Sequence, residues 1–130
     1  MRVLLAEDQP INAEIATTIL EEAGASVFHA EDGLAARKLF ADSEPGFFDA
    51  ILMDLRMPHM DGIGATTAIR GMNRKDSRTV PIIALTADAF AEDAQRCEAA
   101  GMNAHLAKPI DATLLLRMLA SINEERKSKA

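Results

Sequence analysis

The sequence lacks residues on which several classes of function depend. It has no tryptophan, no tyrosine and a single cysteine, Cys97, and its formal net charge is −6 at pH 7. Binding to a nucleic-acid backbone needs clustered Lys and Arg, and binding to single strands needs aromatic side chains on which bases stack. One cysteine cannot form an internal disulfide, and the three scattered histidines have no zinc-ligand spacing. We therefore expect no direct nucleic-acid contact and a reducing environment.

Long hydrophobic runs are also missing. The first apolar run, residues 3–6, ends at the acidic pair Glu7-Asp8, so it is too short for a signal-peptide core or a membrane span. With 130 residues, of which 48% are hydrophobic, the chain can bury one core but is too short for two ordinary domains. We expect one cytoplasmic domain with no direct membrane contact.

Five short apolar runs alternate with segments of helical periodicity. The runs have the composition of parallel strands buried on both faces. They lie at residues 3–6, 26–28, 50–53, 82–85 and 105–107. Such alternation predicts right-handed crossovers and a doubly wound α/β fold, in which helices cover both faces of a five-stranded parallel sheet. The second strand is expected at an edge of the sheet.

The segments between the runs carry helix signals. Ile11, Ile15 and Ile19 recur every four residues and predict one amphipathic helix. Gly24 and Gly101 each follow a helical stretch, where a glycine in the left-handed conformation commonly ends the helix. The last helix is predicted by the spacing of Leu115, Met118, Leu119 and Ile122.

Four of the five expected strands end in a polar residue. Glu7 and Asp8 follow the first strand, Asp54 the third, Thr86 the fourth and Lys108 the fifth. In open α/β sheets ligands bind beyond the carboxyl ends of the strands, so these side chains are expected to meet. Two carboxylates about 4 Å apart repel by roughly 4 kcal/mol at an effective dielectric constant of 20, which calls for a cation. Mg²⁺, or Mn²⁺, and the lysine ammonium suit that place.

This set of side chains contains the parts needed for phosphoryl transfer. Asp54 is the candidate nucleophile, because a carboxylate can form an acyl phosphate, while Thr86 and Lys108 can donate to phosphoryl oxygens. Considered alone, Asp54 could be a solvated turn residue and Thr86 an ordinary strand-end residue. Their occurrence together with the other strand-end residues favours the functional interpretation.

Four motifs resemble the receiver domain of two-component response regulators, in the same order and over nearly the whole chain. They are VLLAED, MDLRMPHMDG, PIIALTA and AGMNAHLAKPI. The resemblance implies a flavodoxin-like (βα)5 sandwich with strand order 2-1-3-4-5, a receiver domain at residues 1–122 and a charged tail at 123–130. The stretches EDQPIN and GATTAIR are most similar to the receivers of hybrid sensor histidine kinases.

The resemblance also implies roles for the acidic residues. Asp54 would be the phosphoacceptor. Asp8, Asp54 and the backbone carbonyl of Arg56 would bind Mg²⁺ directly, and Glu7 would bind it through water. Arg56 and Asp88 resemble the variable pair that tunes the lifetime of the phosphoryl group.

Switching is implied by the same resemblance. Thr86 and Lys108 would contact the phosphoryl group, and the Lys108-Pro109 peptide bond would be cis, which costs little before proline. His105 stands where relatives often have a Tyr or Phe that rotates inward with the threonine. The surface of the fourth helix, fifth strand and fifth helix would then change.

The expected function is that of a phosphoacceptor in a phosphorelay, not an enzyme with a separate substrate. The donor would be a histidine kinase or a histidine phosphotransfer protein, the parent protein could be tethered to a membrane sensor, and phosphorylation could promote dimerisation. Two alternatives are a metal-dependent phosphohydrolase with an aspartyl-phosphate intermediate and a docking module that is never phosphorylated. Hydrolases resembling the haloacid dehalogenase family need a second Asp where this chain has Arg56, and a pure docking module needs none of the site residues.

The remaining polar residues have plainer interpretations. Cys97 is expected to be a small buried helix residue, His59 a solvated loop residue and His29 a strand-end residue without a ligand. A basic loop is expected to face solvent, with partner docking as the alternative. It comprises Arg70, Arg74, Lys75 and Arg78.

Overall fold

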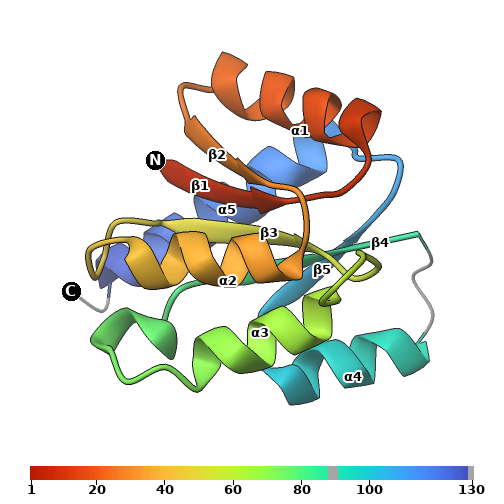
Figure 1. Ribbon diagram of the computed structural model, residues 1–130. Coiled ribbons are helices and arrows are strands. Elements are labelled where there is room, and N and C mark those ends of the chain that lie inside the picture. The colour runs from red at the N-terminus through yellow and green to blue at the C-terminus, as the bar shows by residue number, and fades with distance from the viewer. Residues whose placement is uncertain (88–90, 129–130) are drawn as a thin grey trace.

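The computed structural model describes residues 1–87 and 91–128, which form a three-layer α/β sandwich (Figure 1). One parallel sheet has the strand order β2-β1-β3-β4-β5, so the predicted fold, strand order and edge position of β2 are confirmed. The strands are β1 (Arg2–Ala6), β2 (Ser26–Ala30), β3 (Ala50–Asp54), β4 (Ile82–Thr86) and β5 (Ala104–Ala107). The helices are α1 (Pro10–Glu22), α2 (Gly33–Asp42), α3 (Gly62–Arg70), α4 (Ala91–Ala100) and α5 (Ala112–Ser128), with a 3-10 turn η1 (Lys75–Ser77).

Each face of the sheet buries its own apolar cluster. Side chains alternate along the strands, so Leu4 and Met53 belong to one cluster, while Leu5 and Leu52 belong to the other. Helices α2, α3 and α4 cover the first face, whereas α1 and α5 cover the second (Figure 1). Every residue of β3 and β4 is buried, which explains why these strands read as continuous apolar runs in the sequence.

Helix α1 buries only part of the isoleucine face that the sequence predicted. It packs on the sheet through Ala13, Ala16 and Leu20, and Ile19 is partly buried against the same cluster, whereas Ile11 is 73% exposed and Ile15 is 45% exposed. The small alanines allow the helix to approach the sheet, whose own large side chains fill the space between them. The spacing therefore predicted the helix correctly but only one residue of its buried face.

The other helix predictions have mixed outcomes. Gly24 and Gly101 have φ angles of 91° and 106°, the left-handed conformation expected after α1 and α4. Leu115 and Leu119 of α5 are buried, as their spacing predicted. The same helix continues through Ser128 and so includes most of the segment that was expected to be a tail. Within residues 1–87 and 91–128, no helix is both long and apolar enough to cross a membrane.

Arg74 is a structural residue, contrary to the expectation that it faces solvent. Its Nε donates to Asp76 Oδ1 at 2.6 Å, its Nη1 donates to the carbonyl of Phe40 at 2.7 Å, and its guanidinium lies 4.4 Å from the centre of the Phe40 ring. Burial raises the pKa of Asp76, but hydrogen bonds from Arg74 and from the Gly46 N–H outweigh burial and hold the pKa below its ordinary value. Arg74 thereby ties the loop that contains η1 to the end of α2.

Arg70 is a second structural residue within the basic loop. Its Nε and Nη2 donate to the carbonyl of Gly101 at 3.0 and 2.7 Å, and Nη2 also donates to Asn103 Oδ1 at 3.0 Å. The Asn103 side chain in turn accepts from the N–H of Ile82 at 2.8 Å. These bonds fasten the end of α3 to the segment between α4 and β5. Lys75 and Arg78 are exposed, as predicted.

Candidate metal and phosphoryl site

The sheet brings the predicted site residues together because its strands end level. Asp54 of β3 lies opposite Leu85 of β4, and Thr86 lies opposite Ala107, the residue before Lys108. Beyond these ends is a cleft of about 200 Å³. Its lining includes Asp8, Gln9, Asp54, Arg56, Thr86 and Lys108.

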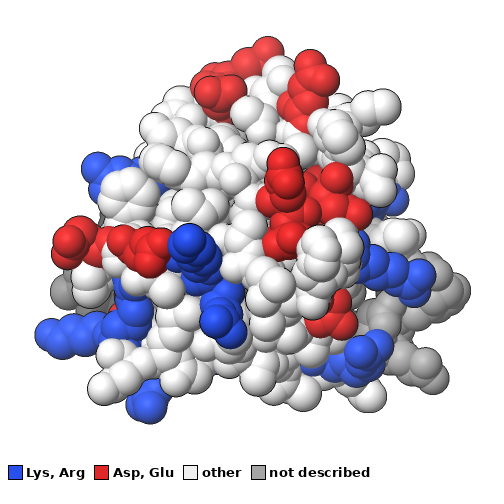
Figure 2. Space-filling view, in the orientation of Figure 1, with Lys and Arg blue, Asp and Glu red and all other residues white. Residues whose placement is uncertain are grey.

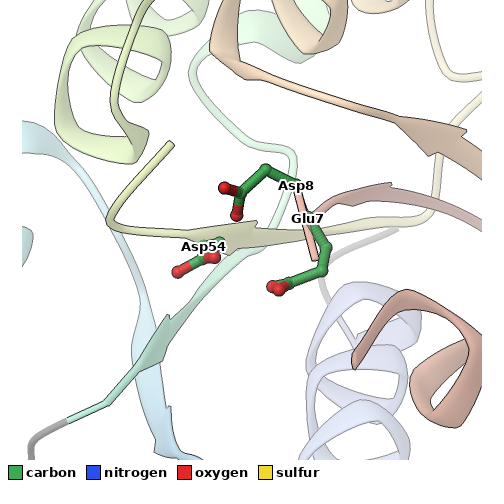
Figure 3. Close-up of side chains that lie close together, drawn as sticks. All are labelled: Glu7, Asp8 and Asp54. Carbon is green, nitrogen blue, oxygen red and sulfur yellow. The ribbon is translucent and has the colours of Figure 1, made fainter. Parts of the chain in front are cut away.

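Three carboxyl groups meet at the cleft. Glu7 is 1% exposed and Asp54 is 4% exposed, while Asp8 is half-buried. One oxygen from each residue lies within 4.8 Å of the other two, and Figure 3 shows the groups turned toward one space beyond β1 and β3. On the molecular surface, one group of Asp and Glu side chains lies over the ends of β1 and β2, other acidic groups lie over α1 and at the left of the view, and Lys and Arg lie both at the edges and over α2 (Figure 2). The cleft therefore holds concentrated negative charge.

Lys108 provides a positive charge within this cluster. Its Nζ donates to Glu7 Oε1 at 3.1 Å and to Asp54 Oδ2 at 3.0 Å. Burial lowers the pKa of Lys108, but the hydrogen bonds with Glu7 and Asp54 more than offset burial, so the pKa is raised and the ammonium stays charged. For Asp54, burial raises the pKa; Lys108 lowers it, while Glu7 raises it further, and the net shift is upward. The single ammonium of Lys108 therefore neutralises only part of the negative charge of the carboxylates.

The donor set fits a hard divalent cation. Glu7, Asp8 and Asp54 offer carboxylate oxygens, the ligands that Mg²⁺ and Mn²⁺ prefer. Added positive charge would offset the burial, and the repulsion from Glu7, that raise the pKa of Asp54. Histidine and cysteine, which softer metals prefer, are not among the residues that line the cleft in the described part of the chain.

Thr86 presents a buried hydroxyl to the same cleft. The residue is 3% exposed, and its Oγ1 has no hydrogen-bond partner within the described structure. Its backbone carbonyl accepts a hydrogen bond from the N–H of Lys108 at 2.7 Å, which joins the ends of β4 and β5. Buried hydroxyls are nearly always paired, so this one is suited to a ligand oxygen in the cleft.

The remaining site predictions concern the rim. The Lys108-Pro109 peptide bond is cis. The N–H of Arg56 donates to Asp54 Oδ1 at 3.3 Å, and its side chain is exposed. His105 is exposed on β5 and does not line the cleft. Asp88 lies outside the described residues, so its pairing with Arg56 stays a prediction.

Two histidines beside the site have contacts that the sequence did not predict. His59 is a solvated loop residue, as expected, with a side chain that is 67% exposed, and its Nδ1 also lies 2.9 Å from Asp32 Oδ2. His29 Nε2 lies 2.7 Å from the carbonyl oxygen of Glu7. The sequence alone does not show that His59 has a partner, because Asp32 lies 27 positions away in the chain. Only the folded arrangement of the loops reveals these contacts.

The fold and the site define a class of protein. The chain belongs to the response regulator receiver domain family, whose model, described as "Response regulator receiver domain", matches residues 3–120. This match confirms the family expected from the four motifs. It covers β1 from its second residue, the other four strands completely, and the site residues.

Individual relatives show which members of the family this chain resembles. Sensor protein GacS of Pseudomonas syringae pv. syringae is 39% identical over 119 residues, and Histidine kinase 1 of Arabidopsis thaliana is 35% identical over 156 residues. These matches cover 91% and 95% of this chain, which spans 13% of the length of each relative. The chain is thus similar to a receiver domain within much longer sensor kinases.

Solved structures agree with this assignment. The receiver domain of sensor histidine kinase PA1611 from Pseudomonas aeruginosa PAO1, with a magnesium ion coordinated in its active-site cleft, is 41% identical and has a TM-score of 0.84. The match covers 94% of this chain and 97% of that one. Chemotaxis protein CheY4 of Vibrio cholerae is 29% identical with a TM-score of 0.84, and the match covers 93% and 97% of the two chains.

Proposed function

We propose that Asp54 accepts a phosphoryl group from a phosphohistidine, carried by a histidine kinase or a histidine phosphotransfer protein. The observation that carries this proposal is a 4% exposed carboxylate in a cleft that also contains a charged lysine and a threonine hydroxyl without a hydrogen-bond partner among the described residues. Each polar group matches one need of an in-line phosphoryl transfer.

The transfer exchanges one bond for another. An oxygen of Asp54 forms a bond to phosphorus as the P–N bond to the donor imidazole breaks. The electron pair of that bond returns to the imidazole nitrogen, which takes a proton from water. Lys108 Nζ, now 3.0 Å from Asp54 Oδ2, then pairs with a phosphoryl oxygen, and the Thr86 hydroxyl donates to another.

Glu7, Asp8, Asp54 and the backbone carbonyl of Arg56 would hold Mg²⁺, or Mn²⁺, at this site. When bound, the ion supplies positive charge that stabilises the phosphoryl oxygens. The protein residues themselves position the nucleophile, since Lys108 and the N–H of Arg56 each bond to one oxygen of Asp54.

Phosphorylation would switch the neighbouring surface. A phosphoryl group adds negative charge and acceptor oxygens. Thr86 would move toward it, which frees space for the exposed His105 to rotate inward. The surface of α4, β5 and α5 would change, at a coupling free energy of about 1 to 3 kcal/mol, and dimerisation could follow.

The exposed face of α1 fits the donor protein. Ile11 and Ile15 are 73% and 45% exposed, and Gln9, the residue before the helix, lines the cleft. An apolar surface this close to the nucleophile can hold a partner whose histidine reaches Asp54. We place this encounter in the cytoplasm, with any membrane tether elsewhere in a longer protein.

The test is phosphorylation of the whole 130-residue chain by radiolabelled acetyl phosphate with MgCl₂. Wild type should gain one base-labile label per chain, and Asp54→Asn should gain none. Equal labelling of both, or no labelling of wild type, would contradict the proposal. Continuous release of phosphate through many turnovers would instead support the phosphohydrolase alternative.

A further inference from the structure

The loop between β3 and α3 contains a strained turn. His59 has a φ angle of 69°, and the N–H of Met60 donates to the carbonyl of Pro58 at 2.7 Å, which closes a three-residue γ-turn. A positive φ is uncommon for a residue other than glycine. Such conformations persist only where the surrounding structure holds them.

The turn that precedes α2 holds this γ-turn from outside the loop. Asp32 Oδ2 lies 2.9 Å from His59 Nδ1, and the N–H of Gly33 donates to the carbonyl of Met60 at 3.0 Å. A Cβ atom on Gly33 would lie 2.1 Å from the Met60 oxygen, so no side chain fits between the two backbones. The two loops are therefore fastened by one side-chain pair and one backbone bond.

The two oxygens of Asp32 have separate roles. Oδ1 accepts from the N–H of Ala35 at 2.8 Å and caps α2, whereas Oδ2 faces His59. The Ala35 N–H, and next the bond with His59, hold the pKa of Asp32 below its ordinary value. The His59 side chain is 67% exposed, and exposed pairs add little to global stability. The pair therefore acts on the local position of the loop.

This loop also carries a proposed metal ligand. Arg56 lies three residues before His59 in the sequence, and its N–H donates to Asp54 Oδ1. At the base of the loop, the N–H of Gly62 donates to the carbonyl of Leu55 at 3.1 Å. With base and tip both fastened, the backbone at Arg56 has little freedom.

We infer that His59 is a positioning residue, which acts through Asp32 to fix the loop and hence the Arg56 carbonyl at the metal site. This inference rests on the proposed function, because it concerns the same site. It predicts that the His59–Asp32 contact raises the affinity for Mg²⁺ without contributing much to folding.

The experiment titrates MgCl₂ into the whole chain and follows backbone amides by NMR. His59→Gly and Asp32→Ser should each weaken binding by about tenfold, the lower end of losses that follow removal of a partner of a ligand. Serine keeps the cap of α2 but is too short to reach His59. His59→Asn should bind like wild type, because the asparagine Nδ2 takes the place of Nδ1 and asparagine tolerates a positive φ.

Thermal unfolding separates positioning from folding. His59→Gly should unfold at or above the wild-type temperature, since glycine accepts the turn without strain. The double variant His59→Gly, Asp32→Ser should lose no more affinity than either single variant.

Three results would overturn the inference: wild-type affinity in His59→Gly, a loss in His59→Asn equal to that in His59→Gly, or additive losses in the double variant. Labelling of wild-type Asp54 by acetyl phosphate is independent of these results. The proposed function would then stand while this inference fell, whereas a wild type that binds no Mg²⁺ would overturn both.

Discussion

Asp54 is almost fully buried, yet its proposed role requires an ionised carboxylate. Burial and the neighbouring Glu7 raise its pKa, while Lys108 opposes them. Sequence spacing could predict that these three residues meet, because the carboxyl ends of parallel strands share one edge. It could not predict the burial of each group, which depends on how the loops close over the strand ends.

We expect Asp54→Asn to stabilise the metal-free protein near neutral pH by about 1 kcal/mol, because it removes a buried negative charge that Glu7 also repels. A raised folded pKa means that the stability tied to protonated Asp54 is complete below the ordinary value of 3.8 and is lost as pH rises through the folded pKa. The Asp54→Asn variant should therefore be more stable than wild type only above pH 3.8. Urea unfolding of both proteins across this range measures it, and a pH-independent difference would contradict the assignment.

Thr86→Val should stabilise the unphosphorylated protein by about 1 kcal/mol, because it replaces a buried hydroxyl that has no hydrogen-bond partner in residues 1–87 and 91–128 with a methyl group. The same change should abolish any phosphorylation-dependent shift of the His105 NMR signals. Thr86→Ser is the matched control, which keeps the hydroxyl and should retain the shift. A less stable valine variant would mean that the hydroxyl has a partner in solution.

At the scale of elements, two glycines differ in what surrounds them. A Cβ atom on Gly62 would lie 2.2 Å from the carbonyl oxygen of Asp54, whereas one on Gly64 would first meet the end of the Asp61 side chain at 3.2 Å. Gly62 thus lets α3 begin directly against the end of β3. The sequence shows that Gly62 belongs to the MPHMDG motif, but it does not show why this position needs a glycine.

We expect Gly62→Ala to lower the free energy of unfolding by about 3 kcal/mol, because the Cβ would clash with the backbone of β3, whose fully buried residues have no room to move aside. Gly64→Ala, in the same helix, should change it by less than about 1 kcal/mol, since the helix propensity of alanine offsets a small side-chain adjustment. Chemical denaturation measures both. Similar effects of the two changes would show that the close approach at Gly62 relaxes in solution.

The elements also show where sequence patterns are insufficient. Every strand was predicted within two residues of its observed ends, because buried parallel strands form apolar runs bounded by polar residues. The buried face of α1 was not fully predicted, because two stripes of that helix are apolar and only packing against the sheet shows which of them is buried. Arg70 and Arg74 were taken for surface charges because a sequence does not show which acceptors they meet, which are mainly backbone carbonyls for Arg70 and both side chains and backbone carbonyls for Arg74.

At the scale of the whole molecule, the exposed isoleucines of α1 allow the docking of a donor protein to be tested separately from phosphoryl transfer. Ile11→Glu should slow phosphotransfer from a phosphorylated histidine phosphotransfer protein by about tenfold, the effect of losing one apolar interface contact. Labelling by acetyl phosphate, which needs no docking, should be unchanged. Leu34→Glu is the matched control, because Leu34 is 44% exposed but lies on α2. If phosphotransfer from the histidine phosphotransfer protein and labelling by acetyl phosphate were slowed equally, the substitution would be acting on the cleft and not on docking.

The bonds from Arg70 determine what kind of motion is open to α4. Its guanidinium holds the carbonyl of Gly101, directly after the last turn of that helix, and also the side chain of Asn103 just before β5. We expect a helix fastened at one end to swing about that end, with a displacement that grows along its length, and not to slide along its neighbours. On the proposed function, a small shift beside Thr86 would then reach a partner protein as a change in the angle of α4.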